Sequence, residues 1–203
     1  MSQLTPIEFL ALTSVILTLV GYAPYIIDTI TGRTSPQRAS WLIWSVLGAI
    51  AVASLIYEEA GASLWFAVAQ VGGTILIYIL SFVFGSGTHL RKSDYRVLAA
   101  AAFGLVLWYF TEQAAYALAI TITISLLGGM MTIKKAFLDP ESETLSTWAI
   151  FLGASVLALA SVDQAELIYY AYPAYLFTLY LGIVLAIFAG KAVRPARAAE
   201  KIA

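Results

Sequence analysis

Long runs of apolar residues alternate with short polar breaks along the whole chain. A helix of about 20 apolar residues spans the hydrocarbon core of a bilayer, and charged residues, Gly and Pro mark the ends of such runs. The pattern predicts seven membrane-spanning helices, over residues 7–30, 38–57, 62–85, 95–111, 114–136, 145–162 and 167–190.

The composition agrees with lipid as the surrounding medium. Of the 203 residues, 61% are hydrophobic and 11% are charged, which is far from the composition of soluble domains. We expect seven spans to leave no room for a separate soluble domain. The chain has no Cys and only His89 as an imidazole, so we expect neither disulfides nor a metal centre.

The basic residues occupy alternate connections between the predicted helices. The first, third and fifth connections and the C-terminal tail hold every Lys and Arg: Arg33, Arg38, Arg91, Lys92, Arg96, Lys134, Lys135, Lys191, Arg194, Arg197 and Lys201. Basic connections stay on the cytoplasmic side of a membrane. We therefore expect the N-terminus outside, the C-terminus in the cytoplasm and a multi-pass protein of a cell membrane, of the prokaryotic inner-membrane type.

An offset of 107 residues superimposes two parts of the chain. It pairs Trp41 with Trp148, and AVAS at 51–54 with ALAS at 158–161. Such self-similarity indicates an internal repeat. The predicted all-α fold is a 3+1+3 arrangement of two parallel triple-helix repeats. Its units are residues 1–90, the linking helix 91–113, and residues 114–203 with a short basic tail.

Residues 21–44, GYAPYIIDTITGRTSPQRASWLIW, resemble the PQ-loop region of the SWEET, SemiSWEET and PQ-loop transporter superfamily. Pro24 and Tyr25 stand where that family has Pro-Gln, residues 32–35 form the basic turn, and Ser40 opens the next helix. In the second repeat Met131 takes the place of the Pro, and residues 139–142 take the place of the turn.

The resemblance implies a carrier whose solute site uses Asn in the third helix of each repeat. This chain contains no Asn. By position, the resemblance assigns those places to Gln70 and to a residue near Thr178 or Tyr180. Nicotinamide riboside carriers are built similarly, so a nucleoside-like solute stands beside a sugar.

Gln70 is the polar residue that points most directly to a site. An amide inside a membrane helix needs a partner, and Gly72 and Gly73 beside it allow a backbone or a solute to approach closely. The alternative is an interhelical hydrogen bond that only holds the bundle together.

Aromatic residues supply further candidates. Trp44 follows Trp41 in the second predicted helix, and Trp148 repeats Trp41 in the sixth. Indoles near helix ends usually belong to the interfacial belt, whereas their recurrence favours a pocket wall. Tyr175 and Tyr180 lie deep in the last helix, where each phenol needs a partner.

Pro24, Tyr25, Asp28 and Pro173 are predicted to form hinges and a gate. A Pro inside a span removes a backbone hydrogen bond and can kink the helix, although static kinks are equally common. Asp28 lies near the cytoplasmic face, where it pairs with Arg33 or Arg38 or, alternatively, couples protons to transport.

Other chemistries find no support in the sequence. The motifs of metalloproteases, nucleotide-binding loops and serine hydrolases are absent, so we expect no enzyme, no cofactor and no nucleic-acid partner. The acidic pair Glu141 and Glu143, beside Lys134 and Lys135, is predicted to form a solvated loop.

The sequence therefore predicts a membrane transporter that acts by alternating access. We expect it to be facilitative, because no midplane carboxylate offers a coupling site. Its solute is small, neutral and polar, such as a sugar or a nucleoside-like metabolite. Lipid is the surrounding partner, and assembly into a homo-oligomer stays open. The alternative is a non-transporting receptor or assembly partner with the same fold.

Overall fold

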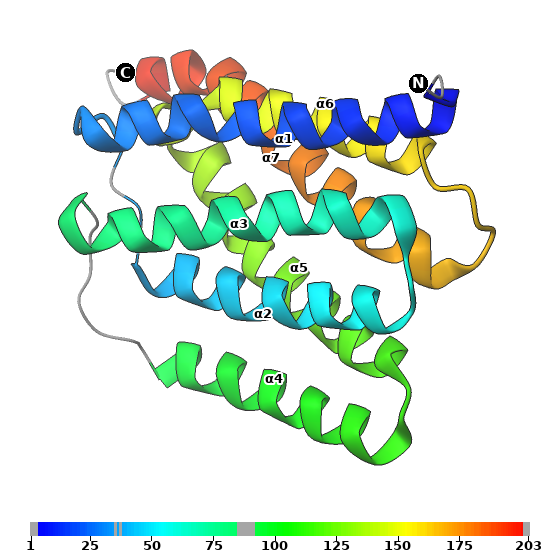
Figure 1. Cartoon of the computed structure of the whole chain (residues 1–203). Helices are drawn as coiled ribbons and strands as arrows, with labels where there is room; N and C mark the ends of the chain where they lie inside the picture. Colours follow the sequence, from blue (N-terminus) through cyan, green and yellow to red (C-terminus); the bar gives the residue numbers. More distant parts are fainter. Residues whose placement is uncertain (1–3, 35, 37, 85–91, 201–203) are drawn as a thin grey trace.

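The computed structural model of the chain describes residues 4–34, 36, 38–84 and 92–200, and every regular element in them is helical (Figure 1). The elements are α1 (Pro6–Ile30), α2 (Arg38–Tyr57), α3 (Gly61–Phe84), α4 (Lys92–Thr111), α5 (Ala114–Leu138), the short 3₁₀ helix η1 (Pro140–Ser142), α6 (Leu145–Ala160) and α7 (Leu167–Glu200).

Some positions of interest in the sequence fall outside this description. Ser35, His89, Arg91 and Lys201 lie outside the described residues, as do the side chains of Ser40, Met131, Ser142, Arg194 and Arg197.

The α-helices of the described residues begin and end within a few residues of the predicted ranges, apart from the end of the last one. α7 continues to Glu200 instead of ending near residue 190. Its final turns are rich in Ala, which has the highest helix propensity of all residues. Residues 191–200 of the expected basic tail are therefore part of α7.

Local chemistry accounts for the first helix boundary. The Thr5 hydroxyl accepts a hydrogen bond from the Glu8 backbone N–H (3.2 Å), and the Glu8 carboxylate accepts one from the Thr5 N–H (2.7 Å). This capping box satisfies two of the backbone donors that a helix leaves free at its start. α1 ends before Gly32, whose φ of +74° is the left-handed conformation that Gly adopts most readily.

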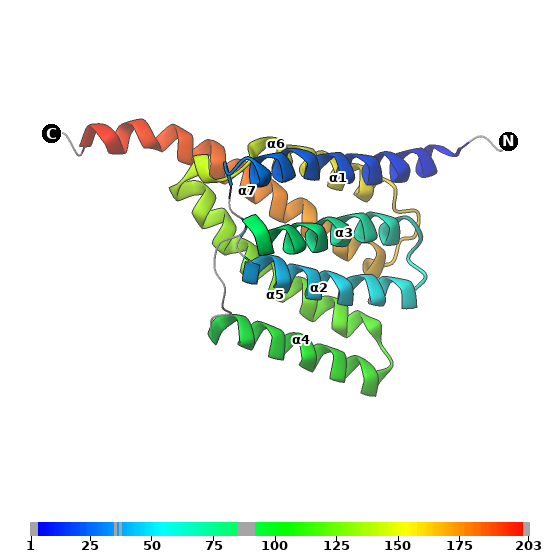
Figure 2. The same ribbon diagram turned by 60° about the vertical axis from the view of Figure 1, so that its left-hand side comes forward.

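The helices form two sets of three with the same packing order (Figures 1 and 2). In the first set α3 packs against both α1 and α2, and in the second set α7 packs against both α5 and α6. Across the sets, α1 packs against α6 and α2 packs against α5. Exchanging α1, α2 and α3 for α5, α6 and α7 therefore reproduces the same pairs.

α4 lies at the edge of the bundle, against α5 and α2. Among the described residues, the main cluster of buried apolar side chains draws on all the α-helices except α4. Ala101 of α4 belongs to a smaller cluster with Leu47, Ile50 and Ala117. The core therefore lies between the two sets of three helices, and α4 packs outside it.

In the described part of the chain, three helices are long and apolar enough to cross a membrane: Pro6–Ile30, Gly61–Phe84 and Leu167–Val193. Shorter apolar segments occur at Trp41–Tyr57, Ala99–Thr111, Ala115–Leu126 and Leu145–Ala160. Large apolar side chains also face outward along the bundle, among them Leu19, Trp65, Ile79 and Phe188, each more than half exposed.

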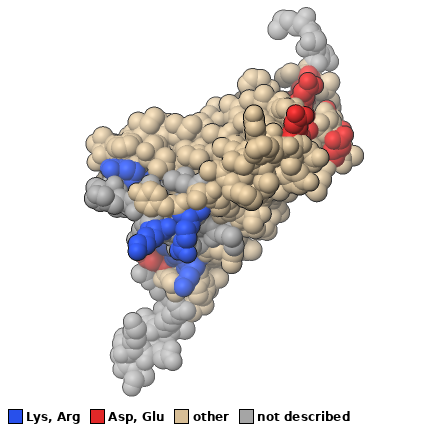
Figure 3. All heavy atoms as spheres, turned by 90° about the horizontal axis from the view of Figure 1, so that it is seen from below, with Lys and Arg blue, Asp and Glu red and all other residues tan. Residues whose placement is uncertain are grey.

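Charged side chains gather at the two ends of the bundle (Figure 3). Lys and Arg cluster at one end, whereas most of the visible Asp and Glu lie at the opposite end, with uncharged surface between them. The N-terminus lies at the end where α2 connects to α3 and α4 to α5 (Figure 1). The connections that alternate between basic and acidic along the sequence thus lie at opposite ends of the bundle.

Candidate functional site

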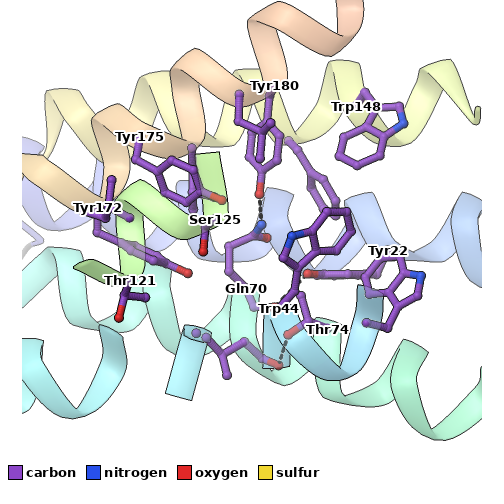
Figure 4. Close-up of a pocket in the computed structure, with 17 residues that line it drawn as sticks. Tyr22, Trp44, Gln70, Thr74, Thr121, Ser125, Trp148, Tyr172, Tyr175 and Tyr180 are labelled. Carbon is purple, nitrogen blue, oxygen red and sulfur yellow. Dashed lines mark hydrogen bonds between the residues drawn. The ribbon is translucent and has the colours of Figure 1, made fainter. Parts of the chain in front are cut away.

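A cavity lies in the middle of the bundle, between the two sets of three helices (Figure 4). Within it, about 60 Å³ can be reached by the centre of a water-sized molecule, and the space not filled by protein atoms is about 600 Å³ when the open mouth is included. The smaller volume holds a few water molecules. A larger solute therefore requires the side chains of the wall to move apart.

The five residues predicted to bind solute all line this cavity. Trp44 comes from α2, Gln70 from α3, Trp148 from α6, and Tyr175 and Tyr180 from α7. Four helices thus bring together residues that lie up to 136 positions apart, from Trp44 to Tyr180. The structure places them in one site, and their role in binding stays a prediction.

Gln70 lies at the centre of the polar part of the cavity. Its amide nitrogen Nε2 donates a hydrogen bond to the Tyr180 hydroxyl, and the Tyr22 hydroxyl donates one of 2.7 Å to the Gln70 backbone carbonyl. The residue is 4% exposed, and its Oε1 atom has no hydrogen-bond partner. The interhelical hydrogen bond that the sequence offered as the alternative exists, but it uses the nitrogen of the amide and not the oxygen.

That orphan oxygen distinguishes a site from a purely structural contact. A buried carbonyl oxygen without a partner costs about 1–3 kcal/mol, and most buried polar atoms avoid this cost. Among the described residues that line the cavity, Gln70 Oε1 is the one buried side-chain polar atom left unpaired. Because almost none of its surface is accessible in this conformation, it accepts a hydrogen bond from a molecule in the cavity only when neighbouring side chains move.

The predicted set of binding residues omitted several residues of the wall. Trp41, Tyr22, Thr121, Ser125 and Phe151 also line the cavity. Two of them carried a signal, because the offset of 107 residues pairs Trp41 with Trp148 and Trp44 with Phe151.

Thr121 and Ser125 of α5 could also have been found from spacing. They lie four residues apart, which puts both on one face of the helix, and both are buried. Tyr22 carried no comparable signal, because its inward position depends on the packing of α1 against α3.

Aromatic rings form most of the cavity wall. The rings of Trp148 and Tyr180 have centroids 5.9 Å apart, and those of Phe151 and Tyr180 lie 5.3 Å apart. On the α2 side, Trp41 and Trp44 meet edge to face at 5.3 Å and 88°. Both Trp41 and Trp148 are buried, so they belong to the bundle interior and not to an interfacial belt.

The two glycines beside Gln70 have different surroundings. A Cβ atom on Gly73 would overlap the ring of Tyr22, whereas Gly72 has no neighbour within 4 Å of that position. The close approach predicted at this pair occurs at Gly73, and the approaching group is a side chain of α1. Gly73 thereby sets the position of the ring whose hydroxyl bonds to Gln70.

Glu143 differs from the prediction. The sequence pattern placed it in a solvated loop, but its side chain is 7% exposed. Its carboxylate accepts hydrogen bonds of 3.0 Å from the Trp148 indole N–H and from the Lys135 ammonium. The prediction was wrong because the connection between α5 and α6 folds back onto the bundle, where the carboxylate meets a residue of the cavity wall.

Asp28 links α1 to the start of α6. Its carboxylate lies 3.6 Å from the Arg33 guanidinium and accepts a 2.8 Å hydrogen bond from the Thr144 hydroxyl. Arg38, the other predicted partner, instead donates to the Ser81 carbonyl at 3.1 Å and lies over the ring of Phe82. Of the two partners proposed from sequence, the structure therefore selects Arg33.

Tyr25 packs near the same end of the bundle. It is buried, and its ring centroid lies 5.1 Å from that of Trp41. Because Trp41 lines the cavity, Tyr25 is in direct contact with the cavity wall. Its predicted role as a gate residue stays a prediction.

The two prolines lie inside continuous helices, Pro24 in α1 and Pro173 in α7. Pro173 has no N–H for the carbonyl of Tyr169, four residues earlier. That carbonyl accepts a 2.7 Å hydrogen bond from the Ser63 hydroxyl of α3 instead. The proline thus frees a backbone acceptor that joins α7 to α3, which is a connection between the two sets of helices.

The cavity is uncharged. Among the described residues, no Lys, Arg, Asp or Glu lines it. Likewise, the described part of the chain contains no group of three or more His, Asp or Glu side chains that could hold a metal ion. The site can therefore offer aromatic surface, hydroxyls and one amide to a bound molecule.

The chain matches no family model, no curated protein and no solved structure. Inferences about its function therefore rest on the geometry of the cavity.

Proposed function

We propose that this protein is a multi-pass membrane carrier that moves a small neutral polar solute through the central cavity by alternating access. The observation that carries the proposal is the unpaired Gln70 Oε1 atom in an uncharged cavity between two similarly packed sets of helices. Sites at the interface between repeats are typical of carriers built from repeats.

The proposed membrane topology has seven spans, with the N-terminus outside and the C-terminus in the cytoplasm. The apolar flanks of the bundle and the collection of Lys and Arg at one end support it. The division into residues 1–90, 91–113 and 114–203 belongs to this proposal, and so does membership of the PQ-loop and SWEET superfamily. The repeated packing order supports the division.

Alternating access requires contacts at both ends of the cavity that can open in turn. At the basic end, Trp148 bonds to Glu143 and Asp28 bonds to Thr144. At the acidic end, Ser63 bonds to the Tyr169 carbonyl, and the Tyr169 hydroxyl donates to the Glu58 carbonyl at 3.1 Å. We propose that these two groups of contacts are the inner and outer gates, with Pro24 and Pro173 as hinges.

We further propose that transport is facilitative. A coupled carrier needs an ionisable group or an ion site that changes state with the solute, and the cavity wall holds no such group among the described residues. Asp28 and Glu143 lie outside the wall, where their hydrogen bonds hold helices together.

Flux through proteoliposomes tests the function. The purified protein is reconstituted, and uptake of labelled sugars, nucleosides and nucleobases is compared with Gln70→Met, which removes the amide at similar length. We expect one solute class to enter, and Gln70→Met to slow its entry by about tenfold, as for loss of one buried hydrogen bond. Thr123→Val is the matched control, because Thr123 is exposed and bonds within its own helix.

Two other outcomes are informative. Binding without flux, seen as thermal stabilisation by a ligand that does not cross the membrane, would establish the non-transporting alternative. A ligand at a hundredfold excess over its dissociation constant stabilises the folded protein by about 2.7 kcal/mol, which is readily measured. Equal flux in Gln70→Met and in the parent protein would show that the solute does not pass through this cavity.

A further inference from the structure

The polar groups of the cavity are unevenly available to a solute. The Tyr22 hydroxyl donates to the Gln70 carbonyl, and the Thr74 hydroxyl donates to the Val71 carbonyl at 2.8 Å. Both of these hydroxyl hydrogens go to backbone carbonyls, whereas Gln70 Oε1 is the buried side-chain acceptor that receives no hydrogen bond among the described wall residues.

A sugar is a poor match for the hydrogen-bonding groups of the cavity wall. Nearly every carbon of a sugar carries a hydroxyl, and each hydroxyl that loses water without gaining a new partner weakens binding. The wall of this cavity is mostly apolar surface, so a solute with a hydroxyl on nearly every carbon would leave several of them unsatisfied.

The walls fit a flat ring better. Eight of the lining residues are aromatic: Tyr22, Trp41, Trp44, Trp148, Phe151, Tyr172, Tyr175 and Tyr180. Aromatic rings pack favourably against one another in offset and edge-to-face arrangements, with a gain beyond simple burial. The rings come from both sets of helices, so a planar molecule can contact both sets at once.

Gln70 determines how a planar molecule would be oriented in the cavity. Figure 4 shows its side chain reaching from α3 toward Tyr180, with Trp44 on one side and Tyr175 and Ser125 on the other. Nε2 donates one of its two hydrogens to Tyr180, whereas Oε1 accepts none. The complementary ligand group is a hydrogen-bond donor, and on a flat heteroaromatic ring that donor is an in-plane N–H.

We propose that the solute is a flat, uncharged heteroaromatic molecule of the nucleobase type, which packs against the aromatic walls and donates an N–H hydrogen bond to Gln70 Oε1. This inference rests on the proposed function for its site and narrows the solute class. The absence of Lys, Arg, Asp and Glu from the described wall residues requires the molecule to be neutral.

The test uses the purified full-length protein and matched pairs of probes. Uracil and adenine are compared with 1,3-dimethyluracil and N6,N6,9-trimethyladenine, which keep the ring and lose every N–H donor, and with glucose and sucrose. Melting temperature and equilibrium binding are measured for each. We expect uracil or adenine to stabilise the protein, and its methylated partner to bind at least about tenfold more weakly.

Variants connect the binding to the named atom. Gln70→Met is expected to lower affinity for the unmethylated base about tenfold and to abolish the difference from the methylated base. Because Gln70→Met could disturb folding through Tyr180, Gln70→Asn, which keeps the amide, provides a second variant. Thr123→Val should bind like the parent protein.

The outcomes separate this inference from the function that it refines. Binding or flux of a sugar but of no base would overturn the solute class and leave the carrier function intact. Equal affinity for methylated and unmethylated bases would overturn the assignment of the donor to Gln70. Binding of bases without flux would support the solute class and overturn the carrier function.

Discussion

The indole nitrogen of Trp148 donates a 3.0 Å hydrogen bond to the Glu143 carboxylate. Trp148 lines the cavity, so this bond connects a cavity residue to an acidic residue at the end of the bundle where Lys and Arg gather. The same carboxylate accepts from Lys135 at 3.0 Å, although the Lys135 side chain is 56% exposed. The Trp148–Glu143 hydrogen bond therefore makes the position of a cavity residue depend on the connection between α5 and α6.

We expect Glu143→Ala to destabilise the protein by about 1–3 kcal/mol, because it leaves the buried indole N–H without an acceptor. Glu143→Gln keeps an acceptor for Trp148 and should lose less than about 1 kcal/mol. The free energy of unfolding in detergent micelles measures both. Glu141→Ala is the control, since its pairing with Lys191 at 3.5 Å is exposed and should contribute almost nothing. Equal losses in Glu141→Ala and Glu143→Ala would contradict the argument.

The hydrogen bond from Ser63 to the Tyr169 carbonyl exists because Pro173 lacks an N–H. We expect Ser63→Ala to cost about 1–3 kcal/mol in the parent protein, since the carbonyl then has no partner. In a Pro173→Ala background the helix supplies its own donor, and the same change should cost less than about 1 kcal/mol. A double-mutant cycle of unfolding free energies measures the coupling, and a coupling of zero would refute this explanation.

Gly73 and Gly72 form a matched pair for the packing of α1 on α3. Gly73→Ala forces the Tyr22 ring away from its place, and we expect a loss of about 1–3 kcal/mol from overpacking, together with weaker binding in the cavity. Gly72→Ala meets no neighbour and should be neutral or stabilising by up to about 1 kcal/mol, because Ala favours the helix. Thermal unfolding distinguishes the two, and a reversed order would show that α1 and α3 pack differently.

The proposed membrane orientation can be tested with single cysteines, because the natural chain has none. Thr31→Cys lies between α1 and α2, and Gln113→Cys lies between α4 and α5; both positions are exposed and uncharged. A maleimide that cannot cross membranes should label Gln113→Cys in intact cells and Thr31→Cys only after the membrane is opened. The opposite result would invert the topology, and labelling of both in intact cells would exclude the proposed number of spans.

The sequence was sufficient to locate the helices. Apolar runs and the residues that interrupt them are local properties of the sequence. The capping of α1 by Thr5 and Glu8 is local too, because it depends on residues only three positions apart. The separation of basic from acidic connections follows directly once helices alternate in direction. For these reasons the helix positions and the two charged ends of the bundle agree with the predictions.

The sequence also identified polar and aromatic residues that meet in the cavity. Gln70 stood out because an amide inside an apolar helix requires a partner, and Trp148 stood out because it repeats Trp41. Both arguments depend on the residue type and on its place along the helix, and neither requires knowledge of the neighbouring helices.

Only the tertiary structure decided which faces of the helices meet. Helices that are apolar on all sides carry no polar stripe to indicate their inward face, so the placement of Tyr22 against Gly73 could not be read from either segment. The burial of Glu143 depended on the connection between α5 and α6 folding back toward Trp148. The unpaired oxygen of Gln70 likewise results from the position of Tyr180 on α7, because a hydrogen bond across 110 residues is decided by packing and not by local sequence.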